Sequence, residues 1–316
     1  MDPHKGPVVL IHGAGVRANI FRAPVAENIV QRLVREGFDV WLEQWRASID
    51  LPFCLWTLDQ AAVYDHPRAV ARVVAETGWQ RVKALVHCQG STSFTMSALA
   101  GLVPQVDTIV SNAVSLVPVV PAFSRTKLNY ALPILQRMTD CLNPQWGEEV
   151  DDFKEWLIRS AALLAHHECN NPVCKMVSFT YGTGFPALWL HENLNSETHE
   201  WLRGEFARVP LTFFAQIREC VAAGGLRSVD GLPELPVDFL AAPPRTEARW
   251  TFIAGERNLC FLPDSQVRAH EHLERHQPGR HSLHIFPNYS HLDVFMGHNA
   301  YRDTFPYIVA ALEKGV

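Results

Sequence analysis

The sequence feature that most constrains the fold is residues 82–94, VKALVHCQGSTSF. Its apolar, β-branched start favours a strand, and the small residues after Gly90 favour a helix. A strand, a tight turn and a helix in this order are typical of a nucleophile elbow, here with Cys88 in the nucleophile position. The glycine lets strand and helix approach closely, and the helix N-terminus favours a thiolate. The alternative interpretation is a buried structural cysteine that ends a core strand.

Length and composition fit one large α/β domain that carries an insertion. The chain has 316 residues and a net charge of −5, so electrostatics gives no reason to expect nucleic acid or an anionic membrane as partner. Seven cysteines lack the pattern of a secreted framework, and no signal peptide follows Met1, which favours a reducing cytoplasm. Prolines and Asp107 interrupt the most apolar long stretch, residues 102–123, so no membrane span is predicted.

Strands and helices alternate on both sides of the elbow. Strands are predicted at residues 7–11, 38–45, 82–86, 106–110, 249–255 and 281–286. Helices are predicted at 21–36 and 59–77, after the elbow, near Asp264 and from about Thr304. Between residues 118 and 244 this alternation stops, and prolines separate segments rich in Trp, Phe and Leu. We therefore expect a core formed by residues 1–117 and 245–316, with a cap inserted at residues 118–244.

The partners of Cys88 are expected after the insertion. His291 lies in a loop after the last predicted strand, where a catalytic base is found when the nucleophile, orienting residue and base follow in that chain order. Asn258 stands three residues after Gly255, in the place of the orienting acid. Asparagine can orient an imidazole through its amide oxygen, and a thiolate needs less help from a carboxylate than serine does. Asp264 ranks second for this role and Asp293 third, because Asp293 is more simply a loop-capping residue.

Two further positions complete the predicted site. Residues 7–11 run into His12-Gly13-Ala14-Gly15, and the backbone N–H groups of Ala14 and Gln89 are expected to form an oxyanion hole. His87 precedes the nucleophile in an extended strand, so we expect its side chain to point to the opposite face and to be structural.

Six pieces of the chain resemble a known family: VVLIHGAG, DVWLEQWRASID, WTLDQAAVYDHPRAV, HCQGSTSF, FIAGERNLCFLPDS and YSHLDVFMG. They are similar to the α/β-hydrolase domain associated with cholesterol-oxidase-like (glucose–methanol–choline) oxidoreductases of bacteria. More distantly they resemble acid lipases, whose elbow has serine in place of Cys88. The resemblance implies an α/β-hydrolase fold and a lipid- or sterol-like substrate. The chain departs from the family in starting at the His-Gly strand, so we expect the first two strands of larger hydrolases to be absent, with either a smaller sheet or one that a partner protein or a missing domain completes. The resemblance assigns Cys88 as nucleophile, His291 as base, Asn258 to the acid position, and the oxyanion donors to Ala14 and Gln89. It also suggests association with such an oxidoreductase.

Several potential metal ligands occur in the predicted cap. They are His166, His167, Glu168, Cys169, Cys174, His191, Glu192, His199 and Glu200. A tetrahedral zinc site favours pairs of ligands at short fixed spacing, and this set lacks a second Cys-x-x-Cys or His-x₃-His pair. We therefore expect a polar, hydrogen-bonded cap, with no metal and no cofactor.

These features predict an acyl-transfer enzyme. The first expectation is a hydrolase of an ester, lactone or thioester on a bulky apolar substrate, with cap aromatic residues lining the pocket. The same acyl-enzyme could pass its acyl group to another acceptor, which would make the protein an acyltransferase or cyclase. A third alternative is a non-catalytic partner of an oxidoreductase.

Overall fold

Six parallel strands form the centre of the molecule in the order β2-β1-β3-β4-β7-β8. The computed structural model describes residues 3–166, 169–184 and 186–314. The strands are β1 (Pro7–Ile11), β2 (Asp39–Glu43), β3 (Val82–His87), β4 (Val106–Asn112), β7 (Arg249–Gly255) and β8 (Ser282–Phe286). Each strand lies within or within two residues of the predicted range, because each is a short apolar run ended by polar residues or glycine.

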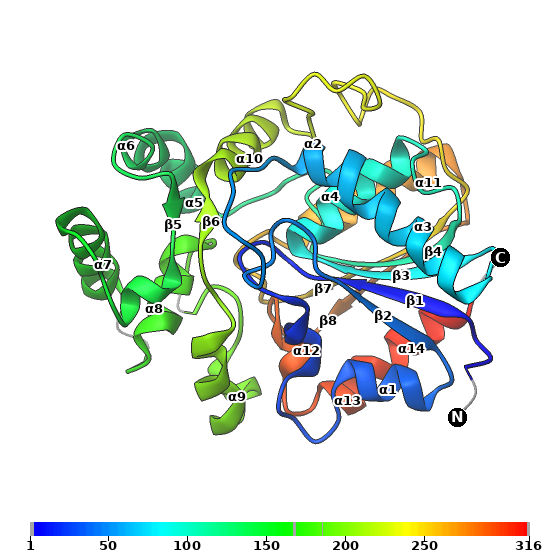
Figure 1. Ribbon diagram of the computed structural model, residues 1–316, viewed down its shortest axis with the longest axis horizontal. Coiled ribbons are helices and arrows are strands. Elements are labelled where there is room, and N and C mark those ends of the chain that lie inside the picture. The colour runs from blue at the N-terminus through cyan, green and yellow to red at the C-terminus, as the bar shows by residue number, and fades with distance from the viewer. Residues whose placement is uncertain (1–2, 167–168, 185, 315–316) are drawn as a thin grey trace.

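Helices cover both faces of this sheet. In Figure 1, α2 (Leu58–Gln60), α3 (His66–Thr77), α4 (Cys88–Leu99) and α11 (Asp264–His276) lie on one face. On the other face lie α1 (Ile29–Arg35), α13 (Ala300–Asp303) and α14 (Phe305–Glu313), with α12 (Asp293–Met296) at one end. The result is a three-layer α/β/α core with a buried parallel sheet.

The predicted helix over residues 21–36 is divided in two. A 3₁₀ turn, η1 (Ala18–Arg22), comes first, and α1 begins only at Ile29. Asn28 caps α1 through a capping box, in which its side chain accepts from Gln31 N and Gln31 Oε1 accepts from Asn28 N, both at 3.0 Å. This local cap outweighs the periodicity that suggested one helix. The helix predicted over 59–77 is continuous, with a π turn, η2 (Ala61–Asp65), just before Pro67, which has no N–H to donate.

The chain between β4 and β7, residues 113–248, has a different organisation. Its helices are mostly short and a two-stranded antiparallel sheet joins β5 (Cys141–Leu142) to β6 (Val209–Pro210). The helical elements are α5 (Ala122–Thr126), η3 (Lys127–Ala131), α6 (Leu132–Leu135), η4 (Pro144–Gly147), α7 (Phe153–Ala165), α8 (Pro172–Thr180), η5 (His191–Asn193), α9 (Ser196–Trp201), η6 (Leu202–Gly204) and α10 (Leu211–Ala223). Figure 1 shows α5 to α9, in green, grouped beyond one end of the sheet. Among the described residues, no helix has the length and apolarity needed to cross a bilayer.

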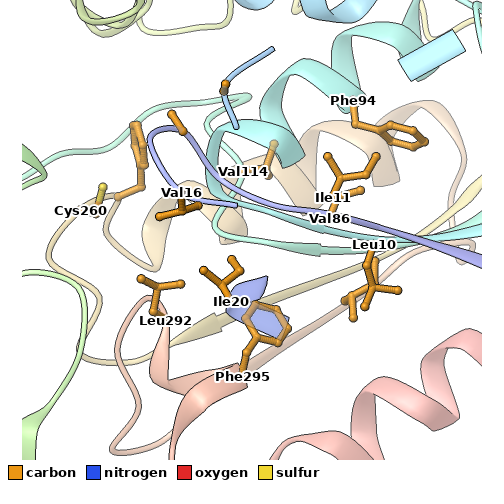
Figure 2. Close-up of a cluster of buried hydrophobic side chains, with 14 of the residues drawn as sticks. Leu10, Ile11, Val16, Ile20, Val86, Phe94, Val114, Cys260, Leu292 and Phe295 are labelled. Carbon is orange, nitrogen blue, oxygen red and sulfur yellow. The ribbon is translucent and has the colours of Figure 1, made fainter. Parts of the chain in front are cut away.

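Buried side chains from both faces of β1 hold the layers together. Figure 2 shows Ile11 and Phe94 on one side of this strand, and Leu10, Ile20 and Phe295 on the other. The alternation of Leu10 and Ile11 is the period of two expected for a strand that is buried on both faces. The carboxyl end of the sheet is thereby fixed against α4 and α12, the two helices that flank the candidate site.

Candidate active site

Cys88 lies at the sharp turn between β3 and α4. It is the first residue of α4, and its φ of 55° is in the left-handed region. A non-glycine residue persists there only where its surroundings fix it, and such positions cluster at functional sites. Gly90 is required by packing, because a Cβ there would lie 2.1 Å from the carbonyl oxygen of His12. The elbow and the loop after β1 are therefore closely packed against each other.

His291 reaches the same point from the loop between β8 and α12. A ring nitrogen of His291 lies within 4.8 Å of the Cys88 Sγ. The loop can approach β7 closely because Gly255 has no side chain: a Cβ there would lie 2.1 Å from the carbonyl oxygen of Ser290. Both Cys88 and His291 are buried. The structure thus brings together the predicted nucleophile and base, which are 203 residues apart in the chain.

Asn258 is the side chain that contacts the other ring nitrogen of His291. Its amide nitrogen lies 3.1 Å from His291 Nδ1, and its Oδ1 accepts a hydrogen bond from Cys260 N at 3.0 Å. In this arrangement the backbone donor orients the amide so that Nδ1 accepts, and a ring with a single proton carries it on Nε2. This differs from the expectation that the amide oxygen would accept from the ring. The reason is local: the N–H of Cys260, two residues on, already occupies that oxygen.

Neither of the two aspartates considered as alternatives hydrogen-bonds the His291 ring among the described residues. Asp264 is exposed at the start of α11. Asp293 is buried, but it accepts hydrogen bonds from Ser290 N (2.7 Å), Leu190 N (3.1 Å) and Asn193 Nδ2 (2.7 Å). Burial, which outweighs these bonds, raises the pKa of Asp293 to about 6. Asp293 therefore organises the loop that carries His291, in keeping with its expected capping role.

His87 does not point away from the site. Its ring centroid lies 4.7 Å from that of His291, and one of its nitrogens lies within 4.8 Å of the Cys88 Sγ. The expected strand alternation fails because the chain turns sharply at Cys88. Asn112 holds the ring: its Nδ2 donates to His87 Nδ1 (2.8 Å) and to the His291 carbonyl oxygen (3.0 Å). Burial, and then the neighbouring His291, keep the pKa of His87 well below its usual value, so its ring is neutral.

The two predicted oxyanion donors flank Cys88. The Gln89 N–H, at the start of α4, faces the Cys88 sulfur. Ala14 lines the small space that also contacts Cys88 and His291, and its N–H donates no hydrogen bond to any described residue. Its carbonyl oxygen is held by Tyr181 Oη at 3.1 Å. Both predicted donors thus lie beside Cys88, and their role as an oxyanion hole stays a prediction.

A second thiol, Cys260, contacts Cys88. A hydrogen bond from Cys260 is the main cause that holds the pKa of Cys88 well below its usual value, and His291 and the Gln89 N–H act in the same direction. The same contact, with burial, raises the pKa of Cys260 well above its usual value. Cys260 therefore stays protonated and donates to a Cys88 thiolate.

Replacing Cys260 with alanine should raise the pH at which Cys88 becomes reactive. A hydrogen bond to a charged group contributes about 1.5–3 kcal/mol, so its loss should move the midpoint of Cys88 alkylation upward by about one to two pH units. The measurement is the rate of iodoacetamide modification of the Cys88 peptide against pH, by mass spectrometry. Cys141→Ala, which removes a half-buried thiol in β5, is the matched control. An unmoved midpoint in Cys260→Ala would show that Cys260 does not support the thiolate.

An apolar cavity opens from Cys88 into the β4–β7 segment. Its volume is about 120 Å³, and Cys88 and Gln89 lie in its wall. Most of the wall is aliphatic or aromatic, from Val120, Leu128, Leu132, Leu135, Leu142, Phe179, Leu211, Phe213, Phe214, Ile217 and Phe261. The Gln89 amide and Thr180 Oγ1, in the same wall, have no hydrogen-bond partner in the described part of the chain. The cavity is therefore suited to a largely apolar molecule that carries a polar group near Cys88.

Two groups of histidine and cysteine side chains bring candidate metal-ligand atoms within 4.8 Å of one another in the described ranges. One is His87, Cys88 and His291. In this group Asn258 and Asn112 already fix the rings, and the thiol–imidazole pair suits nucleophilic chemistry. The other group, Cys169, Cys174, His191 and His199, lies in the β4–β7 segment.

Solved structures with the same chain path include lipases, esterases and a bromoperoxidase. The monoacylglycerol lipase of Paleococcus ferrophilus superposes with a TM-score of 0.58 at 13% identity, covering 99% of this chain and 95% of that chain. A soluble variant of the monoglyceride lipase of Saccharomyces cerevisiae gives a TM-score of 0.60 at 12% identity, covering 99% and 88%. The chain has the α/β-hydrolase fold. Its sheet is the smaller, mostly parallel form predicted from the sequence.

Sequence comparison adds one partial match. Sterol esterase 2 of Saccharomyces cerevisiae is 24% identical over 107 residues, which are 30% of this chain and 20% of that protein. The match therefore spans about a fifth of the length of this curated relative. No protein-family model matches the chain.

Three residues of the site were not predicted from the sequence. Cys260 contacts Cys88, Asn112 holds His87, and Tyr181 holds the Ala14 carbonyl. Two of them could have been found from their place in the sequence, because Cys260 follows Asn258 by two residues and Asn112 ends the strand beside the elbow strand. Tyr181 could not, because it comes from the β4–β7 segment, whose path the sequence does not reveal.

Proposed function

We propose that this protein is a cysteine hydrolase that cleaves an ester, lactone or thioester of a bulky apolar, lipid-, sterol- or polyketide-like substrate. The observation that carries the proposal is the position of the Cys88 sulfur, which lies between His291 and an apolar cavity. Its depressed pKa supplies the nucleophile, since the thiolate is the reactive form. The lipase and esterase relatives support an ester substrate, and the cavity supports an apolar one.

The chemistry follows from the positions of the side chains. The Cys88 thiolate attacks the carbonyl carbon, and the electron pair of the carbonyl moves to oxygen, where the Ala14 and Gln89 N–H groups stabilise it. When the thiolate forms, the Cys88 thiol gives its proton to His291, and collapse of the intermediate breaks the bond to the leaving group, which takes that proton from the His291 imidazolium. The ring nitrogen that gave up this proton then takes one from a water molecule, whose oxygen attacks the acyl carbon, and the acid product leaves as the Cys88 thiolate is restored. The ring can carry its second proton at Nδ1 only when the Asn258 amide turns its oxygen toward it.

Residues 118–244 act as the cap in this proposal. All the cavity wall except Cys88, Gln89, Cys260 and Phe261 comes from this range. The cap encloses the acyl or alcohol part of the substrate, and the unpaired Gln89 amide binds its polar group. A substrate without that polar group would leave a buried amide unsatisfied and bind less well.

A series of p-nitrophenyl esters tests the apolar pocket. Each additional CH₂ that the cavity buries should stabilise the bound transition state by about 0.8 kcal/mol, which raises kcat/KM about fourfold, until the cavity is filled. Leu132→Phe, which narrows the cavity, should reduce kcat/KM for long esters more than for acetate. Leu164→Phe, at a position 75% exposed on α7, is the control. A flat or falling profile with chain length would count against a lipid-type pocket and favour a small polar substrate.

Acyl transfer to another acceptor is the second candidate. The favouring observation is burial: Cys88 is only 7% exposed, so an acyl group on it would be shielded from water. Intact-mass detection of an acyl adduct on Cys88, followed by its decay in water against added alcohols or amines, separates hydrolase from acyltransferase or cyclase. The third candidate, a non-catalytic partner of a cholesterol-oxidase-like oxidoreductase, requires an inert cysteine. Rapid, selective alkylation of Cys88 would exclude it.

A further inference from the structure

A second cluster of thiols and imidazoles lies in the β4–β7 segment. It consists of Cys169, Cys174, His191 and His199, and one ligand atom of each lies within 4.8 Å of those of the other three. None of the four lines either of the two cavities that contact Cys88. The proposed hydrolase chemistry therefore does not use this cluster.

Three elements bring the four side chains together. Cys169 precedes α8, Cys174 lies in its first turn, His191 begins η5 and His199 lies in α9. Asn171 joins the two halves of the cluster: its Oδ1 accepts from Cys174 N at 3.1 Å, and its Nδ2 donates to the His199 carbonyl oxygen at 3.2 Å. No metal was expected from the sequence, because these residues lack short fixed spacing within each pair. In the structure α8, η5 and α9 bring the four side chains together from separate turns, which spacing along the chain does not show.

The distances fit a tetrahedral zinc ion. Zinc binds cysteine sulfur at about 2.3 Å and histidine nitrogen at about 2.0–2.1 Å, so two ligand atoms of a regular tetrahedron lie about 3.3–3.8 Å apart. Cys174 Sγ lies 3.5 Å from His191 Nε2, and Cys169 Sγ lies 3.9 Å from His199 Nε2. The His191 and His199 rings are nearly perpendicular, with an interplanar angle of 85°. Both sulfur–nitrogen distances are therefore close to the spacing of ligands around one zinc ion.

We propose that Cys169, Cys174, His191 and His199 form a structural zinc site. Two cysteines and two histidines are a donor set that zinc prefers, and four protein ligands leave no open position for a substrate. Both thiols lose their protons on binding, so two thiolates balance the charge of the ion and both imidazoles remain neutral. Oxygen-preferring ions such as Mg²⁺ and Ca²⁺ do not match these ligands.

The site would fix the part of the segment that supports His291. Immediately beside His191, Leu190 N donates to Asp293 Oδ2, and Leu188 O accepts from Leu292 N at 2.8 Å. Both bonds hold the two residues that directly follow His291 in its loop. Loss of zinc should therefore lower the melting temperature and loosen the His291 loop, although the metal takes no part in the reaction.

Metal content tests the proposal directly. The full chain, purified with zinc present and then dialysed, should contain about one zinc ion per chain by mass spectrometry of the metal. Cys88→Ala should retain it, which separates this site from the His87, Cys88 and His291 group. The double variant Cys169→Ser with Cys174→Ser should lose it. Cys54→Ser with Cys141→Ser, which removes two thiols elsewhere, should retain it.

Two measurements on the wild-type protein, cobalt substitution and thiol alkylation, test the proposal even if the double variant fails to fold. Cobalt-substituted wild-type protein should show the thiolate-to-cobalt charge-transfer and visible bands of a tetrahedral site. Cys169 and Cys174 should be protected from iodoacetamide in the zinc protein and become reactive after a chelator is added. The proposal is overturned if the wild type holds no zinc and shows no cobalt bands. It is equally overturned if Cys88→Ala removes the metal, or if the two thiols react at the same rate with and without chelator. None of these measurements depends on hydrolase activity.

Discussion

Replacing Cys88 with alanine should abolish turnover and leave the fold intact. Alanine keeps the Cβ that packs against Gly13 at the elbow, so the β3–α4 turn and the oxyanion donors should remain in place. In enzymes of this kind, loss of the nucleophile costs many orders of magnitude and leaves about 10³–10⁴ over water from the oxyanion hole and substrate binding. The measurement is kcat with the preferred p-nitrophenyl ester, with circular dichroism and melting temperature as evidence of folding.

Two further variants make this result specific. Cys54→Ala removes an exposed thiol and should leave turnover unchanged. Cys88→Ser should retain weak activity at best, because a serine hydroxyl needs a stronger base than His291 supplies beside an amide. Undiminished turnover in purified Cys88→Ala would show that Cys88 is not the nucleophile, and would also remove the basis for the proposed acyl-enzyme.

The core and the centre of the candidate site could be predicted because their signals are local. The apolar run of β3, the polar turn at Cys88 and the glycine at position 90 are adjacent in the chain, and so are Gly255 and Asn258. A parallel sheet brings the carboxyl ends of its strands to one edge, which places His291 near Cys88 once the strands are assigned. The α/β-hydrolase fold therefore followed from strand order and a few loop residues.

Other parts depended on contacts that no local pattern encodes. The orientation of the Asn258 amide is set by the N–H of Cys260, and the position of His87 by the unusual φ of Cys88. The cluster around Cys169 and His199 forms only because Asn171 ties α8 to α9. Periodicity and spacing rules describe one element at a time, so they do not report on hydrogen bonds between elements.

Cys88 and Asn258 form a matched pair in the proposed mechanism. A thiolate exists before the substrate arrives, so the ring is not required to remove a proton at the moment of attack. An amide beside Nδ1 is then sufficient, because its main task is to hold the ring. Serine would need the imidazolium to form during attack, and an imidazolium is stabilised by a carboxylate rather than by an amide.

The pairing predicts how substitutions at position 258 should behave. Asn258→Ala should reduce activity by about 10-fold to 10³-fold, because the His291 ring loses its hydrogen bond at Nδ1. Asn258→Asp should give a functional enzyme in which one carboxylate oxygen still accepts from Cys260 N and the other accepts from the ring. Because the carboxylate stabilises the imidazolium, the alkaline limb of the pH–rate profile should move to higher pH. Asp264→Asn is the matched control and should be close to neutral, since that side chain is exposed.

The double variant Cys88→Ser with Asn258→Asp gives the sharpest result. If the nucleophile and the residue at 258 are matched, Asn258→Asp should increase the activity of Cys88→Ser by about tenfold or more, and should help the cysteine enzyme much less. The four enzymes form a double-mutant cycle, measured as kcat/KM with one ester at several pH values. Equal effects of Asn258→Asp on the serine and cysteine enzymes would mean that the residue at 258 does not stabilise the imidazolium. If Asp264→Asn instead loses most of its kcat/KM while Asn258→Ala keeps that of the wild type, Asp264 is the orienting residue and the Cys–His–Asn assignment is wrong.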